Sequence, residues 1–286
     1  MAKAPVNIAA SVRQRLLNIA RTCSQPFDVV LVRFALERLL WRLSISSHRD
    51  RFILKGGLLV TMWVEDEKRV TRDADFLGRG DAAEDSLKAA FIEIMAIPGD
   101  DGILFDAESL TVTAIREEMG YGGTRLRATA YLERTRIPVT LDIAFGDALA
   151  DAPQDLTYPS LLDMAAPNIR AYPPATVIAE KFQAMVALGI ANSRMKDYYD
   201  LWAVPKTIEI AAEDLDAAIG ATFDRRGTAL PPERPPGLSA EFIRDETKQR
   251  QWRAYAASIE LEDAALDMVV EAIWALVGPS CVRLAG

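Results

Sequence analysis

The sequence has very few of the side chains on which nucleophilic and zinc-dependent enzymes depend. Its 286 residues include two cysteines, Cys23 and Cys281, and a single histidine, His48. Two cysteines at opposite ends of the chain argue against a disulfide framework or a cysteine zinc site and are typical of a reducing cytoplasm. A Ser-His-Asp mechanism or a histidine-rich metal site would depend on His48 alone. Any chemistry is therefore expected to rest on carboxylates, which bind Mg²⁺ or Mn²⁺ through oxygen.

Long apolar runs and an excess of positive charge are also missing. We find no apolar stretch that approaches the roughly 20 residues of a membrane span, and the N-terminal segment lacks the apolar core of a signal peptide. We therefore expect a cytoplasmic protein without membrane contact. The net charge of −8 disfavours broad, non-specific binding of nucleic acids, although a local basic patch can still hold such a substrate.

Helical and strand periodicities divide the chain into three regions. Apolar residues at helical spacing predict two N-terminal helices, over residues 10–25 and 27–46. In the middle region a turn at Gly56 leads into a short helix, a further helix is expected over 84–97, and the predicted strands cover 52–55, 71–77, 109–116, 125–133 and 137–145. The segment 146–174 is rich in Asp, Pro and Ala and is interpreted as a connector, after which the pattern is mainly helical.

This order of elements predicts an α+β fold with a small mixed sheet, N-terminal helices and a C-terminal helical region. We expect two parts: residues 1–174, with the N-terminal helices and the catalytic core, and residues 175–286, a helical region that completes the active site. The glycines of "EMGYGGT" (118–124) resemble a phosphate loop, but no strand-loop-helix context accompanies them. That segment is therefore predicted to be a hairpin turn.

Two carboxylates stand close together on the predicted strand "TRDADFL". Side chains alternate along a strand, so Thr71, Asp73 and Asp75 share one face, and the two Asp Cα atoms lie roughly 6.5 Å apart. Two anions at this distance repel each other unless a cation lies between them. The pattern therefore indicates a site for a divalent metal ion.

A third carboxylate fits the same site. In "VTLDIAF" the apolar residues share one face, and Asp142 lies on the other. A lone Asp in a strand is more often a solvent-facing residue, but an Asp-x-Asp pair on the same sheet reverses that preference. Three such carboxylates can hold two metal ions about 3.5–4 Å apart, as in phosphoryl or nucleotidyl transfer.

The glycine pair Gly56-Gly57 supplies a possible phosphate contact. Backbone N–H groups at a helix N-terminus bind phosphate, and glycine lets the phosphate approach closely. Tight packing between a strand and a helix explains most glycine pairs. The pair gains significance because an Asp-x-Asp pattern follows it at short range.

The residues "LKGG…RVTRDADF" resemble the signature of the AbiEii/AbiGii toxin family, within the polymerase-β-like nucleotidyltransferases. That signature consists of Gly-Gly, a short helix, and Arg-x-Ser/Thr-x-Asp-hydrophobic-Asp. Arg69, Thr71, Asp73 and Asp75 occupy its positions. Ala74 is smaller than the branched residue usual at its position.

A second block of the chain, "VIAEKFQAMVALGIANSRMKDYYDLWAV", resembles the family's Glu-Lys-x-x-Ala segment followed by Arg-x-Lys-Asp-x-x-Asp-Leu. The matching residues are Glu180, Lys181, Ala184, Arg194, Lys196, Asp197, Asp200 and Leu201. On a helix, Arg194 with Asp197 and Lys196 with Asp200 would form ordinary surface ion pairs. We expect one of the two acids to be structural, and the resemblance places the functional one at Asp197.

The resemblance implies a nucleotidyltransferase that moves a nucleoside monophosphate from an NTP to an acceptor hydroxyl and releases pyrophosphate. Asp73 and Asp75 would hold Mg²⁺ or Mn²⁺, and Asp142 would complete the metal site and help to deprotonate the acceptor. The residues expected at the triphosphate are Gly56, Gly57, Arg69, Thr71 and Lys181; Lys181 and Asp197 are also expected among the catalytic residues.

The resemblance also implies a biological role as the toxin of a bacterial toxin-antitoxin or phage-defence pair, with an antitoxin protein as partner and tRNA 3′ ends as the acceptor. Two groups of cations are candidates for contacts with RNA phosphates: Arg125, Arg127, Arg134 and Arg136, and Lys248, Arg250 and Arg253. Two other functions stay open. They are transfer, including kinase-like transfer, to a hydroxyl of a protein or small molecule, and non-catalytic nucleotide binding by an interaction protein.

Overall fold

The computed structural model of the protein describes residues 7–116, 122–147 and 149–285. The protein consists of two compact units. Unit 1 comprises Met1–Met62, Val70–Gly146 and Gln154–Ala171. Unit 2 comprises Trp63–Arg69, Asp147–Pro153 and Tyr172–Gly286.

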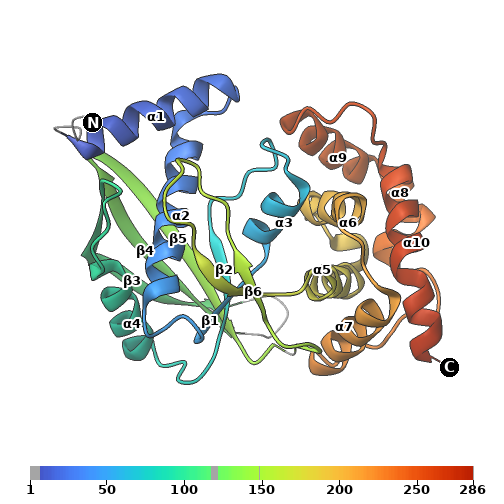
Figure 1. Cartoon of the computed structure of the whole chain (residues 1–286). Coiled ribbons are helices and arrows are strands. Elements are labelled where there is room, and N and C mark those ends of the chain that lie inside the picture. The colour runs from blue at the N-terminus through green and yellow to red at the C-terminus, as the bar shows by residue number, and fades with distance from the viewer. Residues whose placement is uncertain (1–6, 117–121, 148, 286) are drawn as a thin grey trace. The chain divides into compact units, whose positions relative to one another are not determined.

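Unit 1 begins with two helices, α1 (Ile8–Thr22) and α2 (Phe27–Ile45) (Figure 1). The Asn7 side chain caps α1 by accepting a hydrogen bond from the Ala10 N–H at 3.0 Å. Pro26, whose φ of −58° suits the entry to a helix, precedes α2. The unit also contains α4 (Glu84–Ala96) and the first residues of α3 (Gly57–Val64).

The sheet of unit 1 has seven strands in the order β3-β4-β5-β2-β1-β7-β6. Two pairs, β2 with β5 and β1 with β7, are parallel, and the other four pairs are antiparallel. The bounds of the strands are Phe52–Lys55 (β1), Ala74–Gly78 (β2), Ile103–Arg116 (β3), Gly122–Leu132 (β4), Thr135–Phe145 (β5), Gln154–Thr157 (β6) and Asn168–Ala171 (β7).

One face of this sheet is covered by helices. Helix α4 packs on β3, α2 on β5 and β7, and α1 on β4. Alternation along β5 places its apolar side chains on this covered face, where Ile137, Val139, Leu141 and Ile143 are buried. The Phe52 ring of β1 lies 4.8 Å from the Phe91 ring of α4, measured between ring centroids. The core of unit 1 therefore lies between these helices and the sheet.

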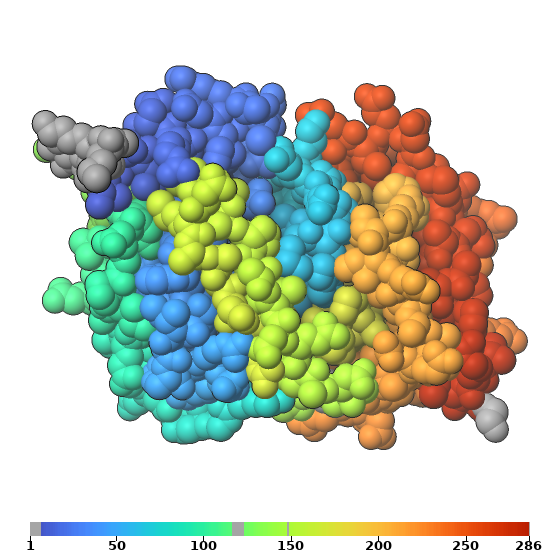
Figure 2. All heavy atoms as spheres, viewed as in Figure 1, coloured from blue at the N-terminus to red at the C-terminus, as the bar shows by residue number. Residues whose placement is uncertain are grey.

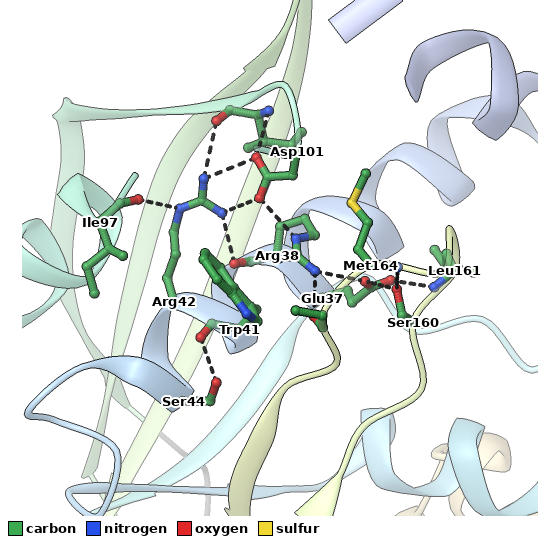
Figure 3. Close-up of polar contacts among 12 residues, drawn as sticks. Glu37, Arg38, Trp41, Arg42, Ser44, Ile97, Asp101, Ser160, Leu161 and Met164 are labelled. Carbon is green, nitrogen blue, oxygen red and sulfur yellow. Dashed lines mark hydrogen bonds and ion pairs between the residues drawn. The ribbon is translucent and has the colours of Figure 1, made fainter. Parts of the chain in front are cut away.

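Helix α2 also carries buried charges that fix the segments around it (Figure 3). Arg42 donates to both oxygens of Asp101, at 2.7 and 3.2 Å, and Arg38 donates to Asp101 at 3.0 Å. Glu37 accepts hydrogen bonds from the Ser160 hydroxyl and the Leu161 N–H. Figure 2 shows the segment 154–171, in yellow-green, at the surface beside the blue helix α2. All four charges are buried with a partner, as buried charges in proteins generally are.

Unit 2 is helical. Its helices are α5 (Pro174–Leu188), α6 (Met195–Thr207), α7 (Ala212–Arg225), α8 (Ala240–Arg244), α9 (Glu246–Ser258) and α10 (Leu266–Ala285), with short 3₁₀ turns at Gly189–Ala191 and Pro236–Leu238. Helix α5 packs on α7, where the Phe182 and Phe223 rings lie 5.3 Å apart. Helix α10 packs on both α6 and α7.

The expectation that no apolar stretch approaches the length of a membrane span is wrong for helix α10. Its 20 residues have a mean hydropathy of 1.5 over an 18-residue window and would suffice by length and composition to cross a membrane. Within that window 39% of the residues are buried in the protein, among them Val269, Val270, Ile273 and Val277. These residues lie on the side of α10 that packs in unit 2, so core packing accounts for much of the apolar character of this helix.

The α+β fold class is confirmed, with a mixed sheet, N-terminal helices and a C-terminal helical region. The interpretation of residues 146–174 as a connector is wrong in part, since β6 and β7 lie within it. Of the predicted hairpin turn 118–124, residues 118–121 lie outside the described residues, while Gly122 and the two residues after it belong to β4.

Candidate active site

A row of four charged side chains crosses the middle of the sheet in unit 1. Lys55 of β1 is in register with Asp75 of β2, Asp75 with Asp142 of β5, and Asp142 with Arg125 of β4. Because side chains in register on adjacent strands point to the same face, all four lie on the face opposite α2 and α4. The two acids occupy the centre of the row, and one cation lies at each end.

Asp75 lies against the glycine pair that ends β1. The Gly57 N–H points to Asp75 Oδ2 at 3.4 Å, and Gly56 has a φ of +68°. A Cβ on Gly56 would lie 2.2 Å from Asp75 Oδ2, so only glycine leaves room for this carboxylate. The turn and the acid therefore depend on each other sterically.

The pKa of Asp75 is raised to about 6. Burial is the main cause, and the negative charges of Asp73 and Asp142 act in the same direction, against the positive charge of Lys55. Carboxylate oxygens are the ligands that Mg²⁺ and Mn²⁺ prefer, and a cation would relieve this repulsion. The donor set of Asp73 and Asp75 therefore fits a divalent metal ion.

Asp73 lies immediately before β2 and is held by its neighbour. The Thr71 hydroxyl donates to Asp73 Oδ1 at 2.8 Å, and Thr71 is 8% exposed. The strand predicted over 71–77 begins only at Ala74, so Thr71 and Asp73 lie in the segment before β2, where this hydrogen bond joins their side chains. The hydrogen bond from Thr71 orients the Asp73 carboxylate before any ligand binds.

Asp142 faces Arg125 rather than the other two acids. Arg125 donates from Nε to Asp142 Oδ1 at 2.7 Å and from Nη2 to Oδ2 at 2.6 Å, which makes a bidentate ion pair. This hydrogen bond is the main cause of a raised pKa of Arg125, and the charges of Asp73 and Asp75 contribute. Within residues 7–116, 122–147 and 149–285, no three His, Cys, Asp or Glu residues converge in a ready-made metal cage.

A second cluster of charges lies in unit 2, between α5, α6 and the segment Trp63–Arg69. Lys181 Nζ lies 2.5 Å from Asp197 Oδ1 and 2.9 Å from Asp200 Oδ2. Arg69 donates to both oxygens of Asp200, at 2.7 and 2.5 Å. Arg69 and Asp200 are each 1% exposed. Unit 2 therefore contains a buried network of two acids and two cations.

A model of one protein family matches most of the chain. It is described as nucleotidyl transferase AbiEii toxin, type IV TA system, and it matches residues 38–276. The chain belongs to the AbiEii family. It is therefore a nucleotidyltransferase-family enzyme and a toxin of the type IV toxin-antitoxin class, which implies an antitoxin partner.

Two solved structures resemble this AbiEii protein. One is a protein assigned as a nucleotidyltransferase from H. pylori, with 13% sequence identity and a TM-score of 0.48, covering 90% of this chain and 96% of that one. The other is JHP933 from Helicobacter pylori, with 13% identity and a TM-score of 0.49, covering 90% and 93%. No curated protein sequence matches the chain. At these TM-scores the two structures add nothing to the family assignment.

The structure separates the predicted site residues of this AbiEii protein into two sets. Unit 1 holds Gly56, Gly57, Thr71, Asp73, Asp75 and Asp142, and unit 2 holds Arg69, Lys181 and Asp197. The roles of these residues with metal and nucleotide stay predictions. The predicted pair of Arg194 with Asp197 is confirmed, with Nε 2.7 Å from Oδ2.

The expectation that Asp200 belongs to an ordinary surface ion pair is wrong. Asp200 is buried, and its carboxylate binds Arg69 and Lys181. Burial alone would raise the pKa of Asp200, but the charges of Lys181 and Arg69 outweigh it and hold that pKa below its usual range. The motif spacing does place a structural acid at Asp200, but its partners come from distant parts of the chain.

Sequence reasoning missed two members of the charged row in the AbiEii sheet. The sequence pattern assigns no role to Lys55 and indicates Arg125 only as an RNA contact. The available signal was position: Lys55 directly precedes the glycine pair, and Arg125 alternates with apolar Leu126 on a strand adjacent to that of Asp142.

Proposed function

We propose that this protein transfers a nucleoside monophosphate from an NTP to a hydroxyl at the 3′ end of a tRNA, with Mg²⁺ or Mn²⁺ bound by Asp73 and Asp75. The observation that carries the proposal is the placement of Asp75. It lies beside Asp73, within reach of the Gly57 N–H, with a pKa raised to about 6 by burial and neighbouring charge. Such a site is arranged to bind cations and phosphate together.

The reaction forms a bond between the acceptor oxygen and the α-phosphorus and breaks the bond from that phosphorus to the pyrophosphate oxygen. The proton of the acceptor hydroxyl passes to a carboxylate, for which we propose Asp142. A bound divalent cation would supply charge stabilisation for the attacking and leaving oxygens. Within unit 1, Gly56 leaves room for the Asp75 carboxylate, and Thr71 orients Asp73. We propose that the backbone N–H groups of the glycine pair also contact the triphosphate.

Lys181 and Asp197 are proposed to take part in nucleotide turnover. Burial would lower the pKa of Lys181, but Asp197 and Asp200 raise it above its usual value, so the side chain stays charged at neutral pH. A charged lysine can favour triphosphate binding and offset the charge of the leaving pyrophosphate. Arg69, which the resemblance assigns to the nucleotide, is held by Asp200 and so fixes the segment that directly precedes Thr71 and Asp73.

The test is a transfer assay with each of the four α-labelled NTPs, MgCl₂ and total tRNA, with protein and water as alternative acceptors. We expect label on tRNA and stoichiometric release of pyrophosphate. Asp75→Asn should abolish both, whereas Asp85→Asn, which removes an exposed acid of α4, should change neither. The absence of pyrophosphate release with every NTP and acceptor would overturn the proposal.

A second acceptor class is favoured by one observation. The net charge of −8 is unfavourable for a polyanionic substrate unless a local basic surface exists. Transfer of label to a protein, including self-modification, with none to tRNA would identify a protein hydroxyl as the acceptor and leave the nucleotidyl-transfer chemistry intact.

A further inference from the structure

We infer that the exposed face of β3, β4 and β5 binds a single-stranded stretch of nucleic acid, whose backbone runs along these strands and ends at Asp142. The inference rests on the proposed function, because it places the acceptor of that reaction. In Figure 1 this is the face of the sheet turned away from α2.

Much of this face is exposed in unit 1, although Thr129, in its middle, is only 5% exposed. The side chains that alternate with the buried core residues are exposed: Leu104, Thr111, Thr113, Arg127, Arg136 and Pro138. Helices α2 and α4 pack on the opposite face, against the buried side chains of β5 and β1. A sheet face with no covering element is available to an extended ligand.

Among the described residues, Asp142 is the one acid that forms an ion pair with an arginine of this face, through Arg125. Arg127 is exposed, and its side chain makes no hydrogen bond or ion pair with any described residue. Arg136 donates only to the neutral Thr129 hydroxyl among the described residues, at 3.4 and 3.3 Å. The Asp106 carboxylate accepts bonds from the backbone N–H groups of Glu108 and Ser109. In a chain of net charge −8, two uncompensated arginines on one face are a local anion-binding feature.

The register sets the spacing of these groups. Arg127 is one row of side chains from the Asp142–Arg125 row, and Arg136, which is in register with Tyr131, is three rows away. At about 6.8 Å per two residues, the distance along the strands is about 20 Å. That is the length of about six stacked nucleotides of one strand at about 3.4 Å each.

The far end of the face is apolar and aromatic. Tyr131 is partly exposed and in register with Leu104, which is 68% exposed. An accessible aromatic ring beside a row of cations is the combination on which unpaired bases stack while their phosphates are neutralised. Bases inside a duplex are not accessible for such stacking, so this surface fits a single strand.

The second group of basic candidates, Lys248, Arg250 and Arg253, does not form such a surface. Lys248 is 7% exposed, and its Nζ donates to the Asn192 carbonyl at 2.9 Å. Arg250 and Arg253 bond to groups of their own helix, the Thr247 hydroxyl and the Gln249 carbonyl. These three cations are therefore engaged within unit 2.

The experiment measures the affinity of the full-length protein for a fluorescein-labelled 12-nucleotide single-stranded RNA by anisotropy between 50 and 200 mM KCl. Arg127→Ala and Arg136→Ala should each weaken binding and reduce the slope of log K against log salt by about 0.7. Tyr131→Ala should weaken binding by about 5- to 150-fold without changing that slope. Lys88→Ala removes one exposed cation from α4, on the other side of the sheet, and should change neither quantity. Thermal melts confirm that each variant is folded.

Equal affinity of all three variants, of Lys88→Ala and of the wild type would overturn the inference. Equal affinity for a 12-base-pair RNA duplex would overturn its single-stranded part. Pyrophosphate release measured in parallel distinguishes failure of the inferred RNA-binding surface from failure of the proposed function. If pyrophosphate release persists while the RNA affinity is unchanged in the Arg127, Arg136 and Tyr131 variants, only the inferred RNA-binding surface is wrong. If release is absent with every acceptor, the proposed function is wrong.

Discussion

Replacement of Asp200 by alanine is predicted to be one of the most destabilising single changes in unit 2. The wild-type carboxylate is fully buried and binds Arg69 through both oxygens, and it also lies 2.9 Å from Lys181 Nζ. The Asp200 and Arg69 side chains are 0% and 1% exposed. Asp200→Ala would therefore remove the carboxylate that accepts two hydrogen bonds from the buried Arg69 guanidinium, and one of the two carboxylates that pair with the Lys181 ammonium.

The expected cost follows from this burial. Removing one partner of a buried ion pair generally costs about 3–5 kcal/mol, because the remaining charge stays desolvated. An exposed pair of the same chemistry is worth about 0–1 kcal/mol. Unit 2 offers such a pair for comparison: Arg283 binds both oxygens of Asp216 at 2.6 and 2.7 Å, with side chains 47% and 21% exposed.

The assay is urea unfolding at pH 7, followed by circular dichroism, on the wild type, Asp200→Ala and Asp216→Ala. Asp200→Ala should lower the free energy of unfolding by about 3–5 kcal/mol and Asp216→Ala by about 1 kcal/mol or less. Similar losses in the two variants would refute the reasoning, because burial is the feature that distinguishes the pairs. Arg69→Met, which removes the buried charge as well, should be less harmful in the Asp200→Ala background than in the wild type.

Three further predictions concern the proposed site. Gly56→Ala should lower the transfer rate on the order of 10²-fold, because the new Cβ would lie 2.2 Å from Asp75 Oδ2. Gly80→Ala, at a position with a φ of +81° and no atom within 4 Å, should carry only the backbone strain and keep full activity. Equal activities of the two variants would contradict this. The pKa of Asp75 is raised to about 6 in the folded state, so the metal-free protein should lose about 3 kcal/mol of stability as pH rises from about 4 to 6. Urea unfolding in EDTA should show this fall of the free energy of unfolding with pH in the wild type and not in Asp75→Asn. Lys181→Ala and Asp197→Ala should each lower kcat/KM on the order of 10²-fold in steady-state kinetics, and normal kinetics in a folded variant would remove that residue from the proposed machinery.

The middle of the fold was predictable because the alternation of side chains is strong there. Strand β1 matches its predicted bounds, and β4 and β5 differ from theirs by at most three residues at either end. The same alternation placed Asp75 and Asp142 on one face, and the register now brings them into one row. These predictions succeeded because they depend on local periodicity alone.

The errors arise where local periodicity is too short or the partner is distant. Strands β6 and β7 have four residues each and, unlike the equally short but apolar β1, contain several polar side chains, so neither a period nor an apolar run marks them. The start of β3 is hidden by the irregular register between Asp106 and Thr111. Asp200 was misjudged because helix spacing considers neighbours three or four residues away, whereas Arg69 lies 131 residues earlier in the chain. Long-range ion pairs leave no signature in a single sequence.

The division of the chain into interleaved segments determines how the protein can be cut. The boundaries of the two units fall after Met62, Arg69, Gly146, Pro153 and Ala171, so no single break in the chain separates them. A break after Ala171, for example, leaves Trp63–Arg69 and Asp147–Pro153 of unit 2 with all of unit 1. A fragment ending near residue 171 would keep Arg69 and lose α6 with Asp200, leaving the guanidinium without its acid. Truncation from the C-terminus should therefore yield insoluble or protease-sensitive fragments, and the folding of unit 2 must wait until most of the chain has been synthesised.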